Sequence, residues 1–389
     1  MQTMKQYLGD AFFTTFQNRP EKFLSCGGRF EVLGNHTDHN HGLCLAATCD
    51  LSIYCAASKR DDLLIRVLSE GFGYFEVDLN SLDKNDDEIG KPSSLIRGIV
   101  AYLASDYQYG GFDIYIKSEI PSGAGVSSSA AFEMLIAETI NVLFNDSEIP
   151  LLNLCKASQH AERDFYGKKC GLLDQIGVAT GGLVYIDFSD IVNPQVASFE
   201  TNFSGYQFAI IDTGGSHEQL SNLYEAIPED MFKVADFFKK AFLNEVSKDE
   251  LLSDKDKIIE TCGLLSYQRA LHFFNENQRV LDARDALKNN NVVKLIELMN
   301  ESRESSTELL HNMFVDKKKD SPLEACELVM KASHNKAGVK NNGGGFAGSI
   351  IALIPEDELA NVKEKVKERY GKNSLYLVKI RNDKVSEIE

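Results

Sequence analysis

The sequence predicts an α+β fold, in which β-strands and helices occupy partly separate stretches of the chain. Strand-like apolar runs occur at residues 112–116, 184–188 and 208–212, and glycines lie between the elements. From about residue 228 to residue 300 the spacing of the apolar residues becomes helical. Strands mixed with segregated helices are typical of a two-layer α+β architecture.

The C-terminal part returns to alternating elements. Residues 349–354 are rich in β-branched and apolar side chains and predict a strand. Residues 356–370 mix acidic and basic side chains in a pattern that favours an exposed helix, and residues 374–380 predict a final strand.

A chain of 389 residues is expected to form about two domains. The pattern of elements is interrupted between residues 190 and 205, where Asn193 and Pro194 favour a turn. We therefore predict an N-terminal domain at 1–198 and a C-terminal domain at 199–389.

The composition narrows the class of protein. A net charge of −17 argues against binding to nucleic acid or to anionic membranes, which require a basic surface, but it allows a local cationic pocket for a small anion. The sequence has neither an 18-residue apolar run nor an N-terminal secretory signal. The eight cysteines form no Cys-x2-Cys pair, which favours free thiols and a cytoplasmic location.

Residues 121–131 (PSGAGVSSSAA) form the most informative segment. They follow the predicted strand at 112–116 and lead into a helical run with apolar residues at 132, 135, 136, 140 and 143. A Gly/Ser loop entering a helix is suited to phosphate, because small residues let backbone N–H groups approach an anion that the helix dipole attracts. The sequence contains no Walker A loop. The alternative is a solvated turn with an ordinary serine cap.

Residues 29–42 place polar side chains after a short apolar strand. Arg29, His36 and Asp38 lie in this segment, and such donors and acceptors suit sugar hydroxyls. Two alternatives remain open at this point. The spacing of His36, His39 and His41 is compatible with a metal site, and the segment is also compatible with a solvated polar turn.

Asp174 lies among apolar neighbours in residues 170–178. A buried carboxylate is costly unless a cation or hydrogen bonds compensate it, so Asp174 is a candidate acid/base group. The alternative is a helix cap. Residues 343–348 contain Gly-x-Gly-x-x-Gly, but a predicted strand follows it and no strand is expected before it, so we reject a dinucleotide-binding motif.

Together these segments resemble the GHMP family of small-molecule kinases, and its galactokinase branch in particular. Residues 28–38 resemble the galactokinase signature, residues 121–131 the ATP loop, and residues 342–348 the third, Gly-rich motif. The resemblance implies a ribosomal-S5-like N-terminal domain, a ferredoxin-like C-terminal domain, and ATP-dependent phosphorylation of the anomeric C1 hydroxyl of a hexose, with galactose as the expected substrate. It also implies ATP and Mg²⁺ as cofactors, and we expect a monomer or weak dimer.

The resemblance assigns roles to individual residues. Asp174 matches the catalytic base and Arg29 the cation beside it, while Ser129 and Glu162 match magnesium ligands. The ATP-binding residues that it implies are Gly123, Ala124, Gly125, Val126, Ser127, Ser128 and Ser129. The sugar-binding residues that it implies are Asn35, His36, Asp38, Gly171 and Tyr224. Residues 93–97 are a further candidate for the adenine contacts by their position.

The chain departs from the family pattern at several positions. Asn35 stands where the signature has a Glu that contacts the 6-hydroxyl, and Lys340-Asn341-Asn342 replaces Arg-Met-Thr. A Glu facing C6 would repel a carboxylate there, whereas Asn would not, so galacturonate or another C6-variant sugar is an alternative substrate. A catalytically inactive sugar sensor on the same fold is a second alternative, although the intact serine triplet and Asp174 argue against it.

Overall fold

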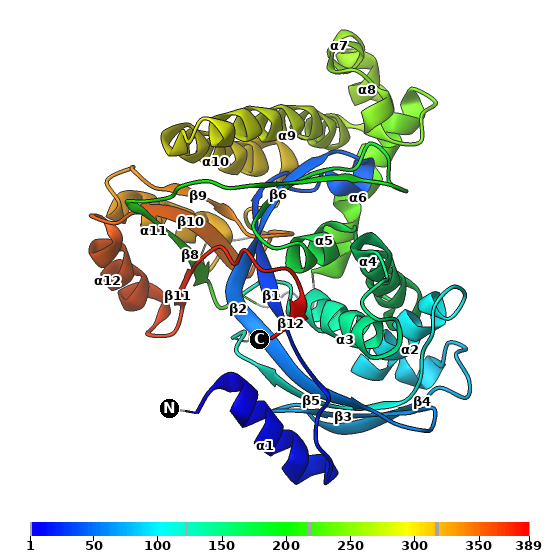
Figure 1. Cartoon of the computed structure of the whole chain (residues 1–389). Helices are drawn as coiled ribbons and strands as arrows, with labels where there is room; N and C mark the ends of the chain where they lie inside the picture. Colours follow the sequence, from blue (N-terminus) through cyan, green and yellow to red (C-terminus); the bar gives the residue numbers. More distant parts are fainter. Residues whose placement is uncertain (1, 122, 216–219, 316–318, 389) are drawn as a thin grey trace.

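The computed structural model describes residues 2–121, 123–215, 220–315 and 319–388, and over these residues it contains two β-sheets flanked by helices (Figure 1). The predicted α+β fold class is confirmed. No helix in these ranges is long and apolar enough to cross a lipid bilayer.

The larger sheet is built around two long antiparallel strands, β1 and β2, and most of its strand pairs are antiparallel. Strand β3 pairs in parallel with β5, and β6 and β7 branch from β2. Its strands are β1 (Lys22–Leu33), β2 (Leu43–Lys59), β3 (Leu64–Ser69), β4 (Gly73–Asp78), β5 (Phe112–Ser118), β6 (Leu183–Asp187), β7 (Gln195–Phe199) and β12 (Ser386–Glu387).

The smaller sheet has the order β11-β8-β10-β9 and is antiparallel throughout. Its strands are β8 (Tyr206–Asp212), β9 (Gly338–Asn341), β10 (Ser349–Pro355) and β11 (Leu375–Val378). The inner faces of these strands carry buried apolar residues that pack against α11 and α12.

The helices have the following bounds: α1 Met4–Phe16, α2 Pro92–Leu103, α3 Ser128–Phe144, α4 Leu151–His160, α5 Leu173–Ala179, α6 Ser221–Phe237, α7 Lys248–Ser253, α8 Lys255–Cys262, α9 Leu264–Lys288, α10 Val292–Ser305, α11 Pro322–Ala332 and α12 Leu359–Tyr370. Two π-helical turns, Ala161–Tyr166 and Ser306–Leu310, continue α4 and α10. Short 3-10 turns span Asp38–Asn40, Asp86–Glu88 and Leu243–Glu245.

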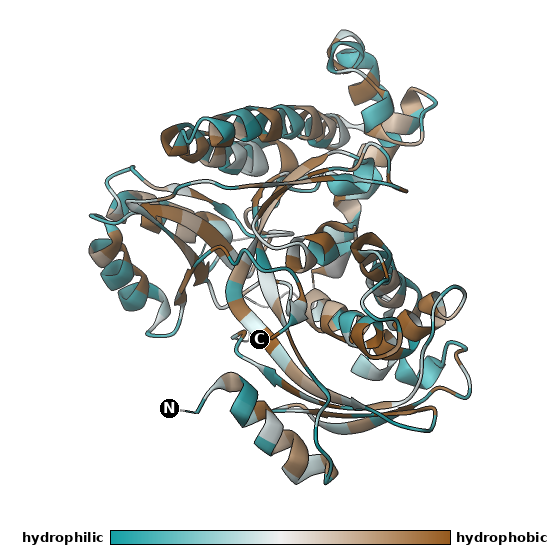
Figure 2. Ribbon diagram, viewed as in Figure 1, coloured by the Kyte–Doolittle hydropathy of each residue, from teal (hydrophilic) through white to brown (hydrophobic). Residues whose placement is uncertain are grey.

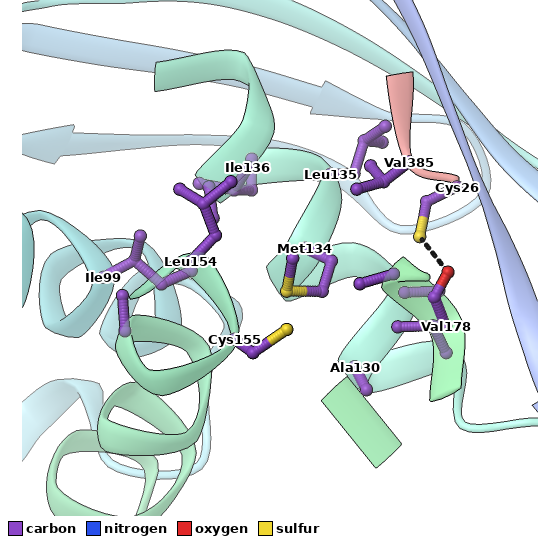
Figure 3. Close-up of a cluster of buried hydrophobic side chains, with 14 of the residues drawn as sticks. Cys26, Ile99, Ala130, Met134, Leu135, Ile136, Leu154, Cys155, Val178 and Val385 are labelled. Atoms are coloured by element: carbon purple, nitrogen blue, oxygen red, sulfur yellow. Dashed lines mark hydrogen bonds between the residues drawn. The ribbon is translucent and has the colours of Figure 1, made fainter. Parts of the chain in front are cut away.

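Helix α3 lies in the centre of the N-terminal core. Its residues Met134, Leu135 and Ile136 are buried with Ile99 of α2 and Leu154 of α4 (Figure 3). Burying a large apolar side chain contributes roughly 1.5–3 kcal/mol. The core therefore fixes α3 firmly, and with it the loop that enters the helix at Ser128.

Helix α12 illustrates the opposite pattern. It is mostly hydrophilic (Figure 2), and its buried residues, Val362 and Val366, are four positions apart on one face. This spacing is the amphipathic pattern expected of a helix that covers one side of a sheet. The predicted helix at 356–370 therefore exists, although it begins three residues later.

The structure corrects two expectations. Strand β9 (Gly338–Asn341) does precede the Gly-rich run at 343–348, although no strand was expected there. Its four residues include Lys340 and Asn341, whose polar side chains interrupt the run of apolar residues from which a buried strand is predicted. The second correction concerns Pro228, which lies inside α6 rather than at the start of the helical region.

The division into domains at residues 1–198 and 199–389 stays a prediction. Strand β7 (Gln195–Phe199) crosses this boundary, and β12 returns from the C-terminal end to pair with β1 in the larger sheet. The expectation of a monomer or weak dimer also stays a prediction.

Candidate active site

Arg29, Ser127 and Asp174 come together from three separate segments. Arg29 lies on β1, Ser127 precedes α3, and Asp174 lies in the first turn of α5. Arg29 Nε donates a 2.8 Å hydrogen bond to Asp174 Oδ1, and Ser127 Oγ donates one of 2.7 Å to Asp174 Oδ2. The Arg29 side chain is 7% exposed and that of Asp174 is 31% exposed, so the carboxylate remains reachable.

The surroundings of Asp174 favour its ionised form. Burial alone would raise the pKa of Asp174, but the charge and hydrogen bond of Arg29, the charge of Lys168 and the Ser127 hydroxyl together lower the pKa below its ordinary value. Burial likewise opposes the charge on Arg29, and its attraction to Asp174 raises the pKa of Arg29. Asp174 is therefore a carboxylate that is able to accept a proton.

The loop before α3 adopts left-handed backbone conformations at three positions. Gly123 and Gly125 have φ values of +82° and +68°, and Ser127 has a φ of +55°. Ser127 occupies the cap position of α3 but makes no side-chain cap hydrogen bond, because its hydroxyl points to Asp174 instead. The N-terminal N–H groups of α3 therefore lack the usual serine partner, so the interpretation as an ordinary serine cap is wrong.

Three sequence motifs meet at the carbonyl oxygen of Gly125. This oxygen accepts hydrogen bonds from Arg29 Nη1 at 3.0 Å and from Asn342 Nδ2 at 2.9 Å. A Cβ atom added at Gly125 would overlap Ser349 Oγ, so this position requires glycine for space as well as for conformation. The predicted phosphate loop is thus held between the signature segment and the third motif.

Ser129 and Glu162 are close enough to share a cation. Ser129 Oγ lies 3.5 Å from Glu162 Oε1, and Glu162 is buried in the π-helical turn that continues α4. A hydroxyl and a carboxylate are the hard oxygen ligands that Mg²⁺ prefers, with nucleotide phosphates supplying the remaining ligands. The residues present therefore fit a magnesium ion. Lys168 Nζ also lies 2.6 Å from Glu162 Oε1.

A second carboxyl group, Glu133, lies behind this pair. Gln175 Nε2 donates hydrogen bonds to Glu133 Oε2 at 3.1 Å and to Glu162 Oε2 at 3.0 Å. Burial and the nearby charge of Glu162 raise the pKa of Glu133 well above its ordinary value. Gln175 therefore links the two carboxyl groups.

The residues predicted to bind the sugar form a second cluster. A Cβ at Gly171 would overlap Asp38 Oδ2, so the Asp38 carboxylate lies directly against the Gly171 backbone. The rings of His36 and Tyr224 are 4.9 Å apart, and a Cβ at Gly344 would overlap Tyr224. The structure therefore brings Asp38, Gly171, His36 and Tyr224 together, while their roles stay predictions.

His36 is held as a neutral ring. Its Nε2 lies 3.0 Å from the Gly344 carbonyl oxygen, which can only accept, so Nε2 carries the proton. Burial, together with the neighbouring His39, lowers the pKa of His36 to about 3. Its Nδ1 is buried with no partner among the described residues, and is free to accept a hydrogen bond.

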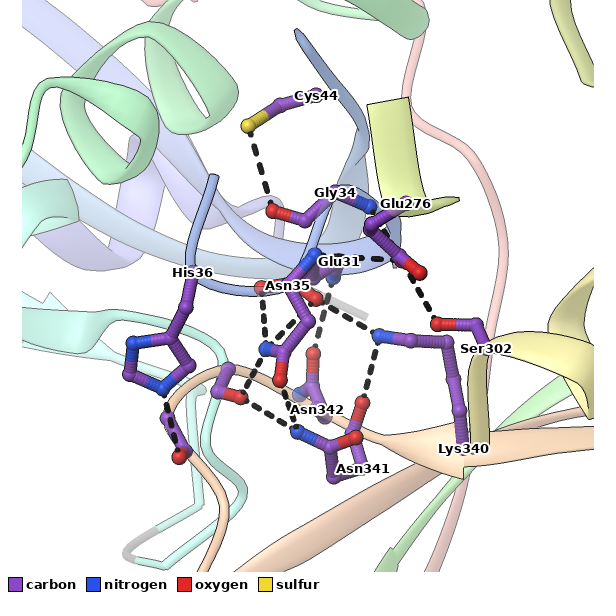
Figure 4. A network of polar contacts seen from close by, with 12 residues as sticks. Glu31, Gly34, Asn35, His36, Cys44, Glu276, Ser302, Lys340, Asn341 and Asn342 are labelled. Atoms are coloured by element: carbon purple, nitrogen blue, oxygen red, sulfur yellow. Dashed lines mark hydrogen bonds and ion pairs between the residues drawn. The ribbon is translucent and has the colours of Figure 1, made fainter. Parts of the chain in front are cut away.

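Asn35 is embedded in a buried polar network (Figure 4) and is only 1% exposed. Its Nδ2 donates to Glu31 Oε1 at 3.0 Å and to the Gly343 carbonyl at 2.7 Å. Its Oδ1 accepts from Asn312 Nδ2 at 2.8 Å and from Asn341 Nδ2 at 3.1 Å. All these hydrogen bonds of the Asn35 side chain are to other protein groups, and a contact with substrate stays a prediction.

Sequence reasoning missed several members of this network. Lys340 Nζ forms a 2.7 Å ion pair with Glu31 Oε1, and both side chains are buried. Glu276 of α9 accepts from the backbone N–H of Gly34 at 2.9 Å and from Ser302 Oγ at 2.7 Å. One available signal was Glu31 itself, a lone charge between Phe30 and Val32 in an apolar strand. No local pattern pointed to Glu276.

Other expectations fall outside the cluster. Arg97, in the candidate adenine segment, hydrogen-bonds to Glu88 and to the Asp78 carbonyl, so its side chain anchors a loop. His41 stacks on Phe242 at 3.7 Å between ring centroids. Within the described ranges, no three His, Cys, Asp or Glu side chains are grouped so that they could hold a metal ion, which gives the histidine metal site no support.

Comparison with known proteins agrees with this arrangement. Residues 94–182 match the family of GHMP kinases N terminal domains, and residues 10–59 match the galactokinase galactose-binding signature. The chain is 31% identical over 359 residues to a galactokinase of Glaesserella parasuis, covering 89% of this chain and 88% of the relative. It is 28% identical over 358 residues to a galactokinase of Actinobacillus pleuropneumoniae, with the same coverage.

Solved structures give the same result. The crystal structure of Lactococcus lactis galactokinase complexed with galactose matches with a TM-score of 0.85 and 26% identity, covering 99% of this chain and 100% of that one. Methanococcus jannaschii mevalonate kinase shares the fold, with a TM-score of 0.62 and 17% identity over 92% of this chain and 98% of that one. The chain belongs to the GHMP kinase family and is a sugar kinase of its galactokinase branch.

Proposed function

We propose that this protein transfers the γ-phosphoryl group of ATP to the C1 hydroxyl of galactose and forms galactose 1-phosphate. The observation that carries this proposal is the contact of Asp174 with Arg29 at 2.8 Å and with Ser127 of the phosphate loop at 2.7 Å. A carboxylate held ionised beside a phosphate-binding loop is positioned to receive the proton of a hydroxyl that attacks the phosphoryl group.

In the proposed reaction, the C1 oxygen of the sugar forms a bond to the γ-phosphorus while the bond between that phosphorus and the β–γ bridging oxygen breaks. ADP leaves with the bridging oxygen, and the C1 hydroxyl proton passes to Asp174. Phosphoryl transfer goes through a loose transition state, so positioning and charge neutralisation supply most of the catalysis. Arg29 keeps the base ionised and the loop at residues 123–129 holds the phosphates.

Magnesium would be held by Ser129 and Glu162 together with phosphate oxygens. When bound, it neutralises negative charge on the phosphates. The support is the 3.5 Å separation between Ser129 Oγ and Glu162 Oε1, together with the burial of the Glu162 carboxylate.

Galactose is favoured over galacturonate by the surroundings of Asn35. The galacturonate hypothesis depends on Asn35 removing a negative charge from the C6 side of the site. In the structure, however, Asn35 donates to the Glu31 carboxylate at 3.0 Å, and Lys340 already neutralises that carboxylate. Asn35 thus has no free N–H group to donate to a sugar carboxylate, and the nearby cation, Lys340, is already paired with Glu31.

The inactive-sensor alternative has no observation in its favour. Ser127 and Asp174 are in hydrogen-bond contact, and Ser129 lies beside Glu162. These are the groups that the proposed phosphoryl transfer requires, and an inactive sensor has no need to keep them in contact.

The test is a coupled ADP-release assay with purified enzyme, ATP and MgCl₂, run with galactose, glucose and galacturonate. The proposal expects kcat/KM to be highest for galactose, with galactose 1-phosphate formed in equal amount to ADP. A higher kcat/KM for galacturonate would show that galacturonate, and not galactose, is the preferred substrate. Tight ATP binding without ADP release in the presence of any of the sugars would establish a sensor instead.

A further inference from the structure

Lys168 occupies an unexpected place beside the proposed magnesium ligands. It follows Gly167, which ends the π-helical turn with a φ of +92°. Its Nζ lies 2.6 Å from Glu162 Oε1, the same oxygen that faces Ser129 Oγ at 3.5 Å. The ammonium group and a cation shared by Ser129 and Glu162 would therefore compete for a single carboxylate oxygen.

The other oxygen of Glu162 already has a fixed partner. Glu162 Oε2 accepts a 3.0 Å hydrogen bond from Gln175 Nε2, and Gln175 is itself fixed by a second hydrogen bond to Glu133. The Glu162 side chain is 3% exposed and lies inside a packed turn, so it has little freedom to rotate. A cation that binds Glu162 at Oε1 would therefore lie against the Lys168 ammonium group, and repulsion between the two positive charges favours displacement of Lys168.

Lys168 is free to move where Glu162 is not. Its side chain is 55% exposed, and its only ion-pair or hydrogen-bond partner among the described residues is Glu162. The side chain has a flexible four-carbon stem and a compact charge with three donors, which suits it to exchange one oxygen partner for another. Burial opposes the charge of Lys168, but its attraction to Glu162 and then to Asp174 raises its pKa, so the group that moves is a cation.

We propose that Lys168 neutralises Glu162 in the nucleotide-free enzyme and, when magnesium–ATP binds, passes from Glu162 to a phosphate oxygen of the nucleotide. In the first state it balances the charge of the buried Glu162 carboxylate. In the second state it adds a positive charge at the phosphates of ATP, besides those of magnesium and the positive end of the α3 helix dipole. Lys168 is thus a further catalytic residue of the reaction proposed above, on which this inference rests.

The neighbouring Lys169 offers a matched control. It carries the same charge in the same loop, but its Nζ pairs with Glu225 at 2.9 Å and its side chain is 72% exposed. Lys169→Gln therefore removes one positive charge from the loop without touching Glu162. Lys168→Arg is a second control, because it keeps a positive charge opposite Glu162 and tests whether the loop tolerates substitution.

The experiment measures Mn²⁺ binding to the nucleotide-free enzyme by electron paramagnetic resonance, and kcat at saturating magnesium–ATP and galactose. The site is identified as the Mn²⁺ binding that Glu162→Gln abolishes. Lys168→Gln is expected to tighten this binding about three- to tenfold, because a competing positive charge is gone. It is also expected to lower kcat about tenfold or more, because a cation is lost from the phosphates. Lys169→Gln and Lys168→Arg are expected to leave Mn²⁺ affinity within twofold of the wild type.

The two readouts separate the possible failures. Unchanged or weaker Mn²⁺ binding in Lys168→Gln would overturn the competition with the metal. Tighter binding with unchanged kcat would overturn the transfer to phosphate. If the wild type failed to phosphorylate galactose, the function proposed above would fall, whereas the Mn²⁺ titration would still report on the competition at Glu162.

Discussion

The guanidinium group of Arg29 lies against the carboxylate of Asp174, with Nε and Oδ1 2.8 Å apart, although 145 positions separate the two residues in the sequence. The same guanidinium donates to the Gly125 carbonyl at 3.0 Å. One side chain thus orients the proposed base and supports the proposed phosphate loop at the same time. This double contact requires the planar, forked geometry that arginine has and lysine lacks.

Arg29→Lys is therefore expected to lower kcat about 100-fold, comparable to the loss of one fixed donor from an active site. Lysine keeps the charge but cannot reach Asp174 and Gly125 together. Steady-state kinetics with galactose measure the effect. Arg97→Lys is the control, because Arg97 is also buried but lies outside the cluster. Its guanidinium donates to the two carboxylate oxygens of Glu88 at 2.7 and 2.8 Å. Equal losses in the two variants would attribute the effect to folding.

Gly171→Ala is expected to raise KM for galactose about tenfold, with a small change in melting temperature. The added methyl group would overlap Asp38 Oδ2, the end of a side chain that is able to turn away. Loss of one well-placed hydrogen-bond group for a sugar hydroxyl is worth about 1 kcal/mol or more, or roughly five- to tenfold in binding. Gly9→Ala on α1 is the control, because its new Cβ meets only ordinary contacts of 3.7 Å. An unchanged KM would place the sugar elsewhere.

The loop at residues 121–131 and the carboxylate of Asp174 could be singled out from the sequence, and their roles stay predictions. Both are encoded locally: glycines and serines before a helix, and one carboxylate among apolar residues. The network around Asn35 could not be predicted in the same way, because its members Glu31, Glu276, Asn312 and Lys340 come from four distant segments. Their side chains meet only after the two sheets and α9 have packed. Strand β9 was missed for a related reason, since its polar residues are buried by this network.

His272 gives a prediction for the pH dependence of stability. It is fully buried, its Nε2 donates to the Asn35 carbonyl at 3.0 Å, and burial lowers its pKa to about 4 in spite of Glu276. The unfolded chain, with a His pKa near 6.5, binds this proton more readily, so the contribution of His272 to stability is lost as pH falls from 6.5 towards 4.

Urea unfolding at pH 7.5 and 5.5 tests this prediction on the wild type and on His272→Gln. The free energy of unfolding of the wild type is expected to drop between these pH values by about 1.4 kcal/mol more than that of the variant, which lacks the titrating ring. The same pH dependence in both proteins would show that His272 does not remain neutral in the folded state.

Lys340→Met is expected to destabilise the fold by about 3–5 kcal/mol, because it leaves the Glu31 carboxylate buried without its cation. Burial already raises the pKa of Glu31 and the attraction of Lys340 opposes that rise, so the carboxylate depends on this partner. Chemical denaturation of the single variant and of Glu31→Gln/Lys340→Met measures the coupling. The double variant should regain part of the loss, and no recovery would show that the two side chains act independently.

The role of Asp174 is the central claim, and the kcat of Asp174→Asn with galactose and saturating magnesium–ATP tests it most directly. Asparagine fills the same space and is able to accept from Arg29, but it cannot take up the C1 hydroxyl proton. The wild type should release ADP and galactose 1-phosphate in equal amounts, and the variant should bind both substrates with kcat lowered about 100- to 10,000-fold. A kcat close to that of the wild type would contradict the assignment of Asp174 as the base.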